Sequence, residues 1–185
     1  MEILIIQGFA AATPRIIFEK TVRSLDFQYW TLGNLIAHEI KNYTPLGQLA
    51  KSIMDKDELL PFSLVQEIIE NAVNQCGEKK GIFMDGFIRT PHQATLLLDF
   101  LLQNPDNKVR GIFFHTPKEA IIARLKPRHN WEDSDEVLFM ERLNRIELEA
   151  NELKTYLESR IEVTTIDGAG TIDEISNRLL TALKV

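Results

Sequence analysis

The stretch Ile3-Leu4-Ile5-Ile6-Gln7-Gly8-Phe9-Ala10-Ala11-Ala12-Thr13-Pro14-Arg15 decides how this chain folds. Its opening apolar run shows no polar alternation, which is typical of a strand buried on both faces. Thr13-Pro14 then pairs a helix N-cap residue with a proline at the first helical position. The stretch therefore predicts a buried strand, a short loop and a helix that begins near Pro14.

The loop of this stretch lies where a phosphate-binding loop would lie. In G-x-x-x-x-G-K-[ST], glycines let successive backbone N–H groups point at phosphate oxygens, and the lysine adds a positive charge. Here only Gly8 is kept, Ala10–Thr13 replace most of the glycine content, and Pro14 stands in place of the lysine. We therefore expect a degenerate Walker A loop, with Arg15 as the nearest cation.

The alternation of strand and helix continues along the whole chain. The predicted strands are Glu2–Gln7, Phe27–Thr31, Gly81–Asp85, Val109–His115 and Ile161–Ile166. The predicted helices are Pro14–Leu25, Gly33–Lys41, Pro45–Asp55, Ser63–Cys76, Pro91–Gln103, Lys118–Leu125, Asp135–Glu158 and Ile172–Leu183. This pattern predicts an α/β fold with a parallel sheet flanked by helices.

Ligands bind such sheets at the carboxyl ends of the strands. We therefore expect one crevice formed by the loops that follow Gln7, Thr31, Asp85 and His115.

Composition limits the class of protein. The chain has 185 residues, 44% of them hydrophobic and 26% charged, which suits one globular domain. Its net charge of −6 argues against binding to nucleic acid polymers or to anionic membranes. The single cysteine, Cys76, excludes an internal disulfide and suits a reducing compartment. The N-terminal apolar run is too short for a signal peptide or a membrane span, so we expect a cytoplasmic protein.

Several segments, in register over nearly the whole chain, resemble the adenylate kinase family. Tyr43–Asp55 resembles its nucleotide-clamp helices, and Asp85-Gly86-Phe87-Ile88-Arg89-Thr90 with Gln93 resembles its D-G-[FY]-P-R-T…Q segment. Arg124-Leu125-Lys126-Pro127-Arg128 is similar to the R-x-x-x-R that enters its lid. Asp133–Glu136 with Arg142-Leu143 resembles the lid exit, and Asp167-Gly168 its last strand-to-helix turn.

The resemblance implies a P-loop-NTPase-like three-layer fold around a five-stranded parallel sheet. It implies one domain over residues 1–185, with a core of residues 1–31, 77–125 and 135–185. Residues 32–76 would form a nucleotide-clamp helical insert, and residues 126–134 a short lid.

The resemblance also implies roles for individual residues. Arg89 would hold the acceptor phosphate and Gln93 would hydrogen-bond the adenine, while Arg124, Arg128 and Arg142 would clamp the transferring phosphates. Further nucleotide contacts would come from Gly8, Arg15, Met54, Asp85 and Gly86. Asp85 would orient the water shell of Mg²⁺, which takes most of its ligands from phosphates and water. The plainer alternatives are an exposed loop arginine, a strand-end carboxylate and a solvated basic face.

The resemblance fails at several phosphate contacts. Besides Pro14, Trp131 stands where the family has an arginine. Leu32-Gly33-Asn34-Leu35-Ile36 occupies the segment T-G-[DE]-[LM]-[LI]-R, with Ile36 in place of the arginine that would hold the acceptor phosphate and Leu32 in place of a hydroxyl residue. Ile88 replaces a proline whose preceding bond is cis in the family. A cis bond before isoleucine would cost about 3 kcal/mol, so we expect a trans bond.

Two functional hypotheses follow, with an empty structural protein as a third. The first is a protein that binds a nucleotide or another phosphorylated small molecule, with weak or absent phosphoryl transfer and room for a protein partner. The alternative is a divergent but active nucleoside-monophosphate kinase that uses ATP with Mg²⁺, Arg15 and the lid arginines replacing the lysine.

Overall fold

A computed structural model describes residues 1–8, 15–125 and 133–183. Its strands are β1 (Glu2–Gly8), β2 (Phe27–Thr31), β3 (Gly81–Asp85), β4 (Lys108–His115) and β5 (Glu162–Asp167). Its helices are α1 (Arg15–Leu25), α2 (Leu32–Lys41), α3 (Pro45–Met54), α4 (Phe62–Gln75), α5 (Pro91–Leu101), α6 (Lys118–Leu125), α7 (Asp133–Glu158) and α8 (Ile172–Leu183). Each predicted element is present, and its ends shift by at most two residues.

The five strands form one parallel sheet in the order β2-β3-β1-β4-β5, which confirms the predicted fold class. The first strand of the chain, β1, lies at its centre. Ile6 pairs with Asp85 of β3, and Gly8 pairs with Phe114 of β4. The carboxyl ends of the three central strands therefore meet at one edge of the sheet.

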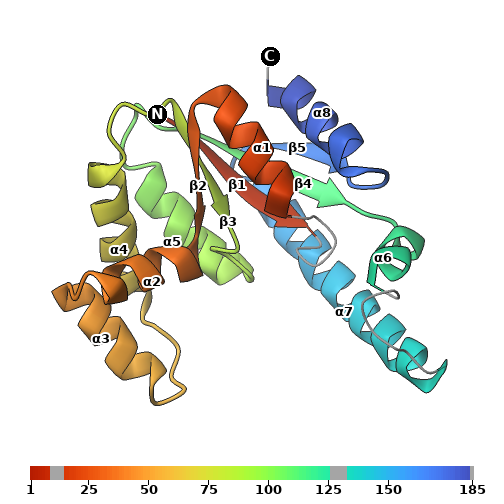
Figure 1. Cartoon of the computed structure of the whole chain (residues 1–185), viewed down its shortest axis with the longest axis horizontal. Helices are drawn as coiled ribbons and strands as arrows, with labels where there is room; N and C mark the ends of the chain where they lie inside the picture. Colours follow the sequence, from red (N-terminus) through yellow and green to blue (C-terminus); the bar gives the residue numbers. More distant parts are fainter. Residues whose placement is uncertain (9–14, 126–132, 184–185) are drawn as a thin grey trace.

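Two hydrophobic layers explain the apolar run of β1. Leu4 and Ile6 belong to the layer under α1 and α8, where they pack with residues such as Phe18. Ile3 and Ile5 belong to the opposite layer, whose residues come from α4, α5 and α7. All four β1 side chains are at most 4% exposed. Because helices cover both faces of the sheet, neither face of β1 needs polar residues (Figure 1).

The remaining helices extend from the two ends of the sheet. In Figure 1, α2 and α3 lie beyond β2, while α6 and the first turns of α7 lie beyond β4. The proposed division into a core, an insert of residues 32–76 and a lid of residues 126–134 stays a prediction. No helix in the described part of the chain is long and apolar enough to cross a membrane.

Candidate nucleotide site

A cavity of about 430 Å³ lies at the carboxyl edge of the sheet. Gln7 and Gly8 of β1, Asp85 of β3 and Phe114 of β4 line it, together with the loop that follows β3. Its remaining wall comes from α1 and α7. Of the four loops expected at the crevice, the loop after Asp85 lines this cavity; β1 contributes its end with Gly8, and β4 contributes Phe114 but no residue of the loop after His115. The loop after Thr31 is not part of this lining, because β2 is the outermost strand and α2 begins at once at Leu32.

The segment from Asp85 to Gln93 is built by hydrogen bonds within itself. Thr90 is the N-cap of α5, and its hydroxyl accepts the backbone N–H of Gln93 at 3.2 Å. The Gln93 Oε1 in turn accepts the backbone N–H of Arg89 at 2.8 Å. This reciprocal arrangement, similar to a capping box, fixes the backbone of Arg89 while its side chain stays exposed. Gln93 was predicted to hydrogen-bond the adenine. Because its Oε1 already accepts the Arg89 N–H, its Nε2 hydrogens are the donors that remain for a nucleotide base.

The end of β1 is joined to this segment. The Gln7 amide donates to the carbonyl of Ile88 at 3.2 Å, which brings the Arg89 segment against the cavity that Arg89 lines. Gly8 has a φ of +124°, and a Cβ there would lie 2.4 Å from the Phe114 carbonyl oxygen. Only glycine suits that position. The described residues contain no cis peptide bond, so the bond before Ile88 is trans, as predicted.

Asp85 is a partly buried carboxylate with a specific partner. Its Oδ2 accepts the hydroxyl hydrogen of Tyr29, a residue of the neighbouring strand β2, at 2.5 Å. Burial raises the pKa of Asp85, while the Tyr29 hydrogen bond and the charge of Arg15 act in the opposite direction. Burial, followed by the contact with Asp85, also raises the pKa of Tyr29, so the phenol stays a donor at neutral pH.

Arg15 is close to this pair. Its guanidinium lies over the Tyr29 ring, 5.4 Å from the centroid, and its Nε forms a 2.8 Å ion pair with Glu19. The Arg15 side chain is 57% exposed. Sequence reasoning singled out Arg15 and Asp85 but missed Tyr29, because all five residues of β2 are polar or aromatic and no motif distinguishes Tyr29 from the others.

Arg142 reaches the cavity from α7. Glu149, Ile146, Ala150 and Leu153 of the same helix line it as well, at the spacing of one helical face. The described lining therefore carries two cations, Arg89 and Arg142, and two carboxylates, Asp85 and Glu149.

Arg124 occupies a different place. Its Nη2 donates to the carbonyls of Gly168 and Gly170, at 2.7 Å and 3.0 Å, in the turn between β5 and α8. Desolvation lowers its pKa. Arg124 is thus engaged with the backbone of that turn and does not line the cavity. Its suggested partner on one helical face, Arg128, follows the end of α6 at Leu125 and lies outside the described residues.

The other residues predicted to contact the nucleotide either lie outside the described residues, lie away from the cavity or line it. The loop of residues 9–14 and Trp131 lie outside the described residues. Met54 ends α3, is 47% exposed and is not part of the cavity lining. Ile36, predicted to stand in place of the acceptor arginine, is a core residue, 7% exposed. The arginine is the sixth residue of the family segment, and the sixth position counted from Leu32 is Ala37, an exposed residue of α2. Gly86 lines the cavity with a φ of +72°.

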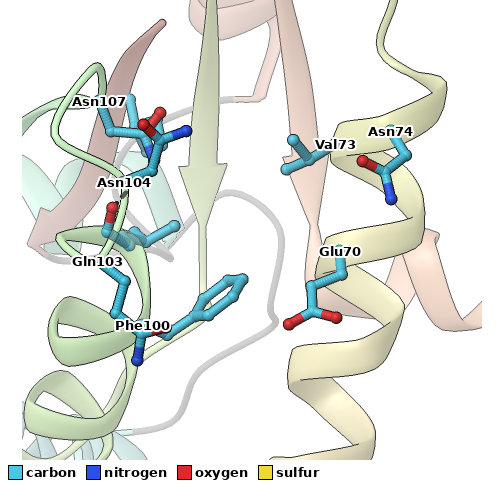
Figure 2. A pocket seen from close by; sticks show the side chains of 9 residues that line it. Glu70, Val73, Asn74, Phe100, Gln103, Asn104 and Asn107 are labelled. Atoms are coloured by element: carbon cyan, nitrogen blue, oxygen red, sulfur yellow. Dashed lines mark hydrogen bonds between the residues drawn. The ribbon is translucent and has the colours of Figure 1, made fainter.

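A second cavity, of about 400 Å³, lies between α4 and α5 and is lined by amides and by Phe100 (Figure 2). Three of its five polar side chains already take part in local hydrogen bonds. The Asn107 amide donates to the Leu101 carbonyl, Asn104 Oδ1 accepts the N–H of Asp106, and Glu70 accepts from Gln66. These side chains stabilise the local fold, so the carboxyl-edge cavity is the stronger candidate for a ligand site.

Among the described residues, no three His, Cys, Asp or Glu side chains gather in a way that would hold a metal ion. Asp85 is a single carboxylate at the strand end, with Oδ2 bound to Tyr29. One carboxylate fits a Mg²⁺ ion that arrives with a phosphate ligand, because that ion takes its other ligands from phosphates and water.

Comparison with known proteins agrees with this geometry. The family model described as adenylate kinase matches residues 16–179, nearly the whole chain after Arg15. An adenylate kinase of Mycobacterium sp. (strain MCS) is 32% identical over 165 residues, which cover 89% of each chain. Adenylate kinases of Mycolicibacterium paratuberculosis and Mycobacterium tuberculosis are each 30% identical over 89% of this chain. This chain belongs to the adenylate kinase family.

Proposed function

We propose that this protein is an active, divergent nucleoside-monophosphate kinase that transfers a phosphoryl group from ATP to a nucleoside monophosphate. The observation that carries the proposal is the cavity in which Gly8, Asp85, Arg89 and Arg142 meet. Phosphoryl transfer needs positioning and charge stabilisation more than a covalent catalyst, and the two arginines of the cavity lining would supply both. That the relatives are named adenylate kinases supports the same proposal.

Each residue has a distinct part in this proposal. Arg89, with its backbone anchored by Gln93, offers a planar fork that binds a phosphate through two N–H groups. Arg142 adds positive charge from the α7 wall. Mg²⁺ would neutralise charge on the nucleotide phosphates, and Asp85 would hold it through the carboxylate oxygen opposite the Tyr29 contact. We also place the protein in the cytoplasm, in line with its single cysteine.

A second candidate is a nucleotide-binding protein with little or no phosphoryl transfer. It is favoured by Pro14 at the position of the phosphate-binding lysine, since loss of one preorganised charged donor costs roughly 10²–10³ in rate.

A coupled assay for ADP formation from ATP and AMP separates the two candidates, with GMP, CMP and UMP as further acceptors. We expect turnover that depends on both substrates, roughly 10²–10³ below that of the Mycobacterium tuberculosis relative assayed in parallel. Nucleotide binding by calorimetry without transfer to any acceptor would favour the second candidate. Neither binding nor transfer would leave only a structural role.

A matched pair of α7 variants tests the cavity itself. Arg142 lines it, whereas Arg145, one turn further along the helix, is exposed and does not. We expect Arg142→Ala to lower kcat/KM about 10²-fold and Arg145→Ala to leave it within about twofold. Equal effects of the two substitutions would show that the cavity is not where the phosphates react.

A further inference from the structure

Tyr29 makes three contacts at the carboxyl edge of the sheet that the proposed function does not yet explain. Its hydroxyl donates to Asp85, its ring stacks on Phe18 at 5.5 Å with an interplanar angle of 8°, and the Arg15 guanidinium lies over the ring. The stack on Phe18, which is 2% exposed, fixes the plane of the ring. Tyr29 is therefore a rigid link between an exposed cation and a cavity carboxylate.

Arg15 lies close to where a donor phosphate would bind. It is the first residue of α1, directly after the loop that follows β1, and its charge is felt by Asp85 in the cavity. Glu19 forms an ion pair with its Nε at 2.8 Å. An arginine side chain loses much conformational entropy when it is held in one place, so a platform that holds it beforehand lowers the entropic cost of binding an anion.

We propose that Tyr29 is a positioning residue, whose ring holds Arg15 beside the cavity so that Arg15 supplies the charge for the ATP phosphates that Pro14 lacks. The inference rests on the proposed function and deepens it, because it names the cation for the donor phosphates. A guanidinium that lies over an aromatic ring interacts with it through its face, so the N–H groups at its edge can still donate to an anion.

The first test measures binding of ATP and adenosine by isothermal titration calorimetry. Charge-assisted hydrogen bonds to phosphate predict that Arg15→Ala weakens ATP binding roughly tenfold or more and leaves adenosine binding unchanged. The matched control is Arg23→Ala, which removes an exposed arginine from the last turn of the same helix and should change neither affinity. Equal ATP affinities of the Arg15 and Arg23 variants would overturn the inference.

The second test separates the ring of Tyr29 from its hydroxyl. In titrations with ATP without Mg²⁺, in which Asp85 has no metal to hold, Tyr29→Phe keeps the platform and should leave the ATP affinity within about twofold. Tyr29→Leu removes the platform and should weaken ATP binding about three- to fivefold. In an Arg15→Ala background, Tyr29→Leu should add no further loss. Equal losses with Phe and Leu, or a Leu effect that persists without Arg15, would contradict a role of the ring in placing Arg15.

These outcomes also distinguish failure of the inference from failure of the proposed function. A wild-type protein that binds ATP and forms ADP, while Arg15→Ala does so equally well, refutes only the inference. A wild-type protein that does not bind ATP refutes the proposed function and the inference together. Thermal unfolding of each variant shows whether it is folded, and Tyr29→Phe, which keeps the stack on Phe18, tests the proposal even where Tyr29→Leu is unstable.

Discussion

Two neighbouring loops at the same edge of the sheet have diverged to different degrees. The segment after β3, from Asp85 to Gln93, keeps the family's acidic, arginine and glutamine positions. The segment after β1 keeps Gly8 and has Pro14 where the resemblance implies a lysine. The two segments follow adjacent strands, since Ile6 pairs with Asp85, and their described residues Gly8 and Arg89 line the same cavity.

In these two segments, some residue types are required by packing and others only by what the cavity binds. Gly8 is kept because the backbone of Phe114 leaves no room for a Cβ, whatever the loop binds. Arg89 has no such constraint, since its side chain is exposed. A residue retained without a packing reason, next to a cavity, is the better indicator of function. In the proposed function, the β3 segment would therefore bind the acceptor phosphate, and Arg15 would bind the donor phosphates.

Removal of the Arg89 side chain should have the largest effect on function. We expect Arg89→Ala to lower kcat/KM roughly 10²–10³-fold, because a preorganised cation for the phosphate is lost. The free energy of unfolding should change by less than about 0.5 kcal/mol, because the side chain is exposed. Steady-state kinetics and urea unfolding measure the two quantities. Arg89→Lys, which keeps the charge without the fork, should have kinetics between those of the wild type and Arg89→Ala. Unchanged kinetics in Arg89→Ala would remove the β3 segment from the site.

Two glycines allow a direct comparison of how tightly the loops are packed. Gly8→Ala combines a positive φ with a steric clash against Phe114, so we expect a loss in unfolding free energy of about 3 kcal/mol. Gly86→Ala has a positive φ of +72° but meets nothing within 4 Å, so we expect about 1–2 kcal/mol. Chemical denaturation of both variants checks the order. A larger loss of unfolding free energy in Gly86→Ala than in Gly8→Ala would mean that the backbone of the β3 segment is more tightly constrained than the end of β1.

The smallest effect should come from substitution of Gln93, whose side chain accepts a hydrogen bond from the Arg89 backbone. Gln93→Leu removes the acceptor for the Arg89 N–H, which should speed hydrogen exchange at that amide and cost at most about 1 kcal/mol. Gln93→Glu keeps the acceptor, so the amide should stay protected. A Glu variant that retains protection but loses discrimination between AMP and other monophosphates would show that the Nε2 donors also contact the base. Full protection of the Arg89 amide in the Leu variant would contradict the anchoring role.

Much of the fold was predictable from the sequence. The apolar run of β1 predicted a strand buried on both faces, and the predicted ends of the strands and helices agree with the observed ends to within two residues. Such signals are local, because caps and burial periodicity depend on a few neighbouring residues. Motif spacing also predicted that Asp85 and Arg89 act at one site, and the two residues do line the same cavity.

The contacts of single side chains were less predictable. Arg124 had the spacing of a phosphate clamp, yet it holds the carbonyls of Gly168 and Gly170, more than forty residues away. Tyr29 had no motif at all. Its contact with Asp85 arises because β2 lies beside β3 in the sheet, so that the Tyr29 hydroxyl can donate a hydrogen bond to the Asp85 carboxylate.

From the sequence alone came the order of strands and helices and the parallel sheet, since both follow from residue types at short range. The tertiary structure showed which side chains come together: Arg89 and Arg142 in one cavity lining, Tyr29 in contact with both Arg15 and Asp85, and Arg124 in the β5–α8 turn. The physical reason is that such partners come from strands and helices far apart along the chain. Their meeting depends on the register and order of the sheet, which no local pattern encodes.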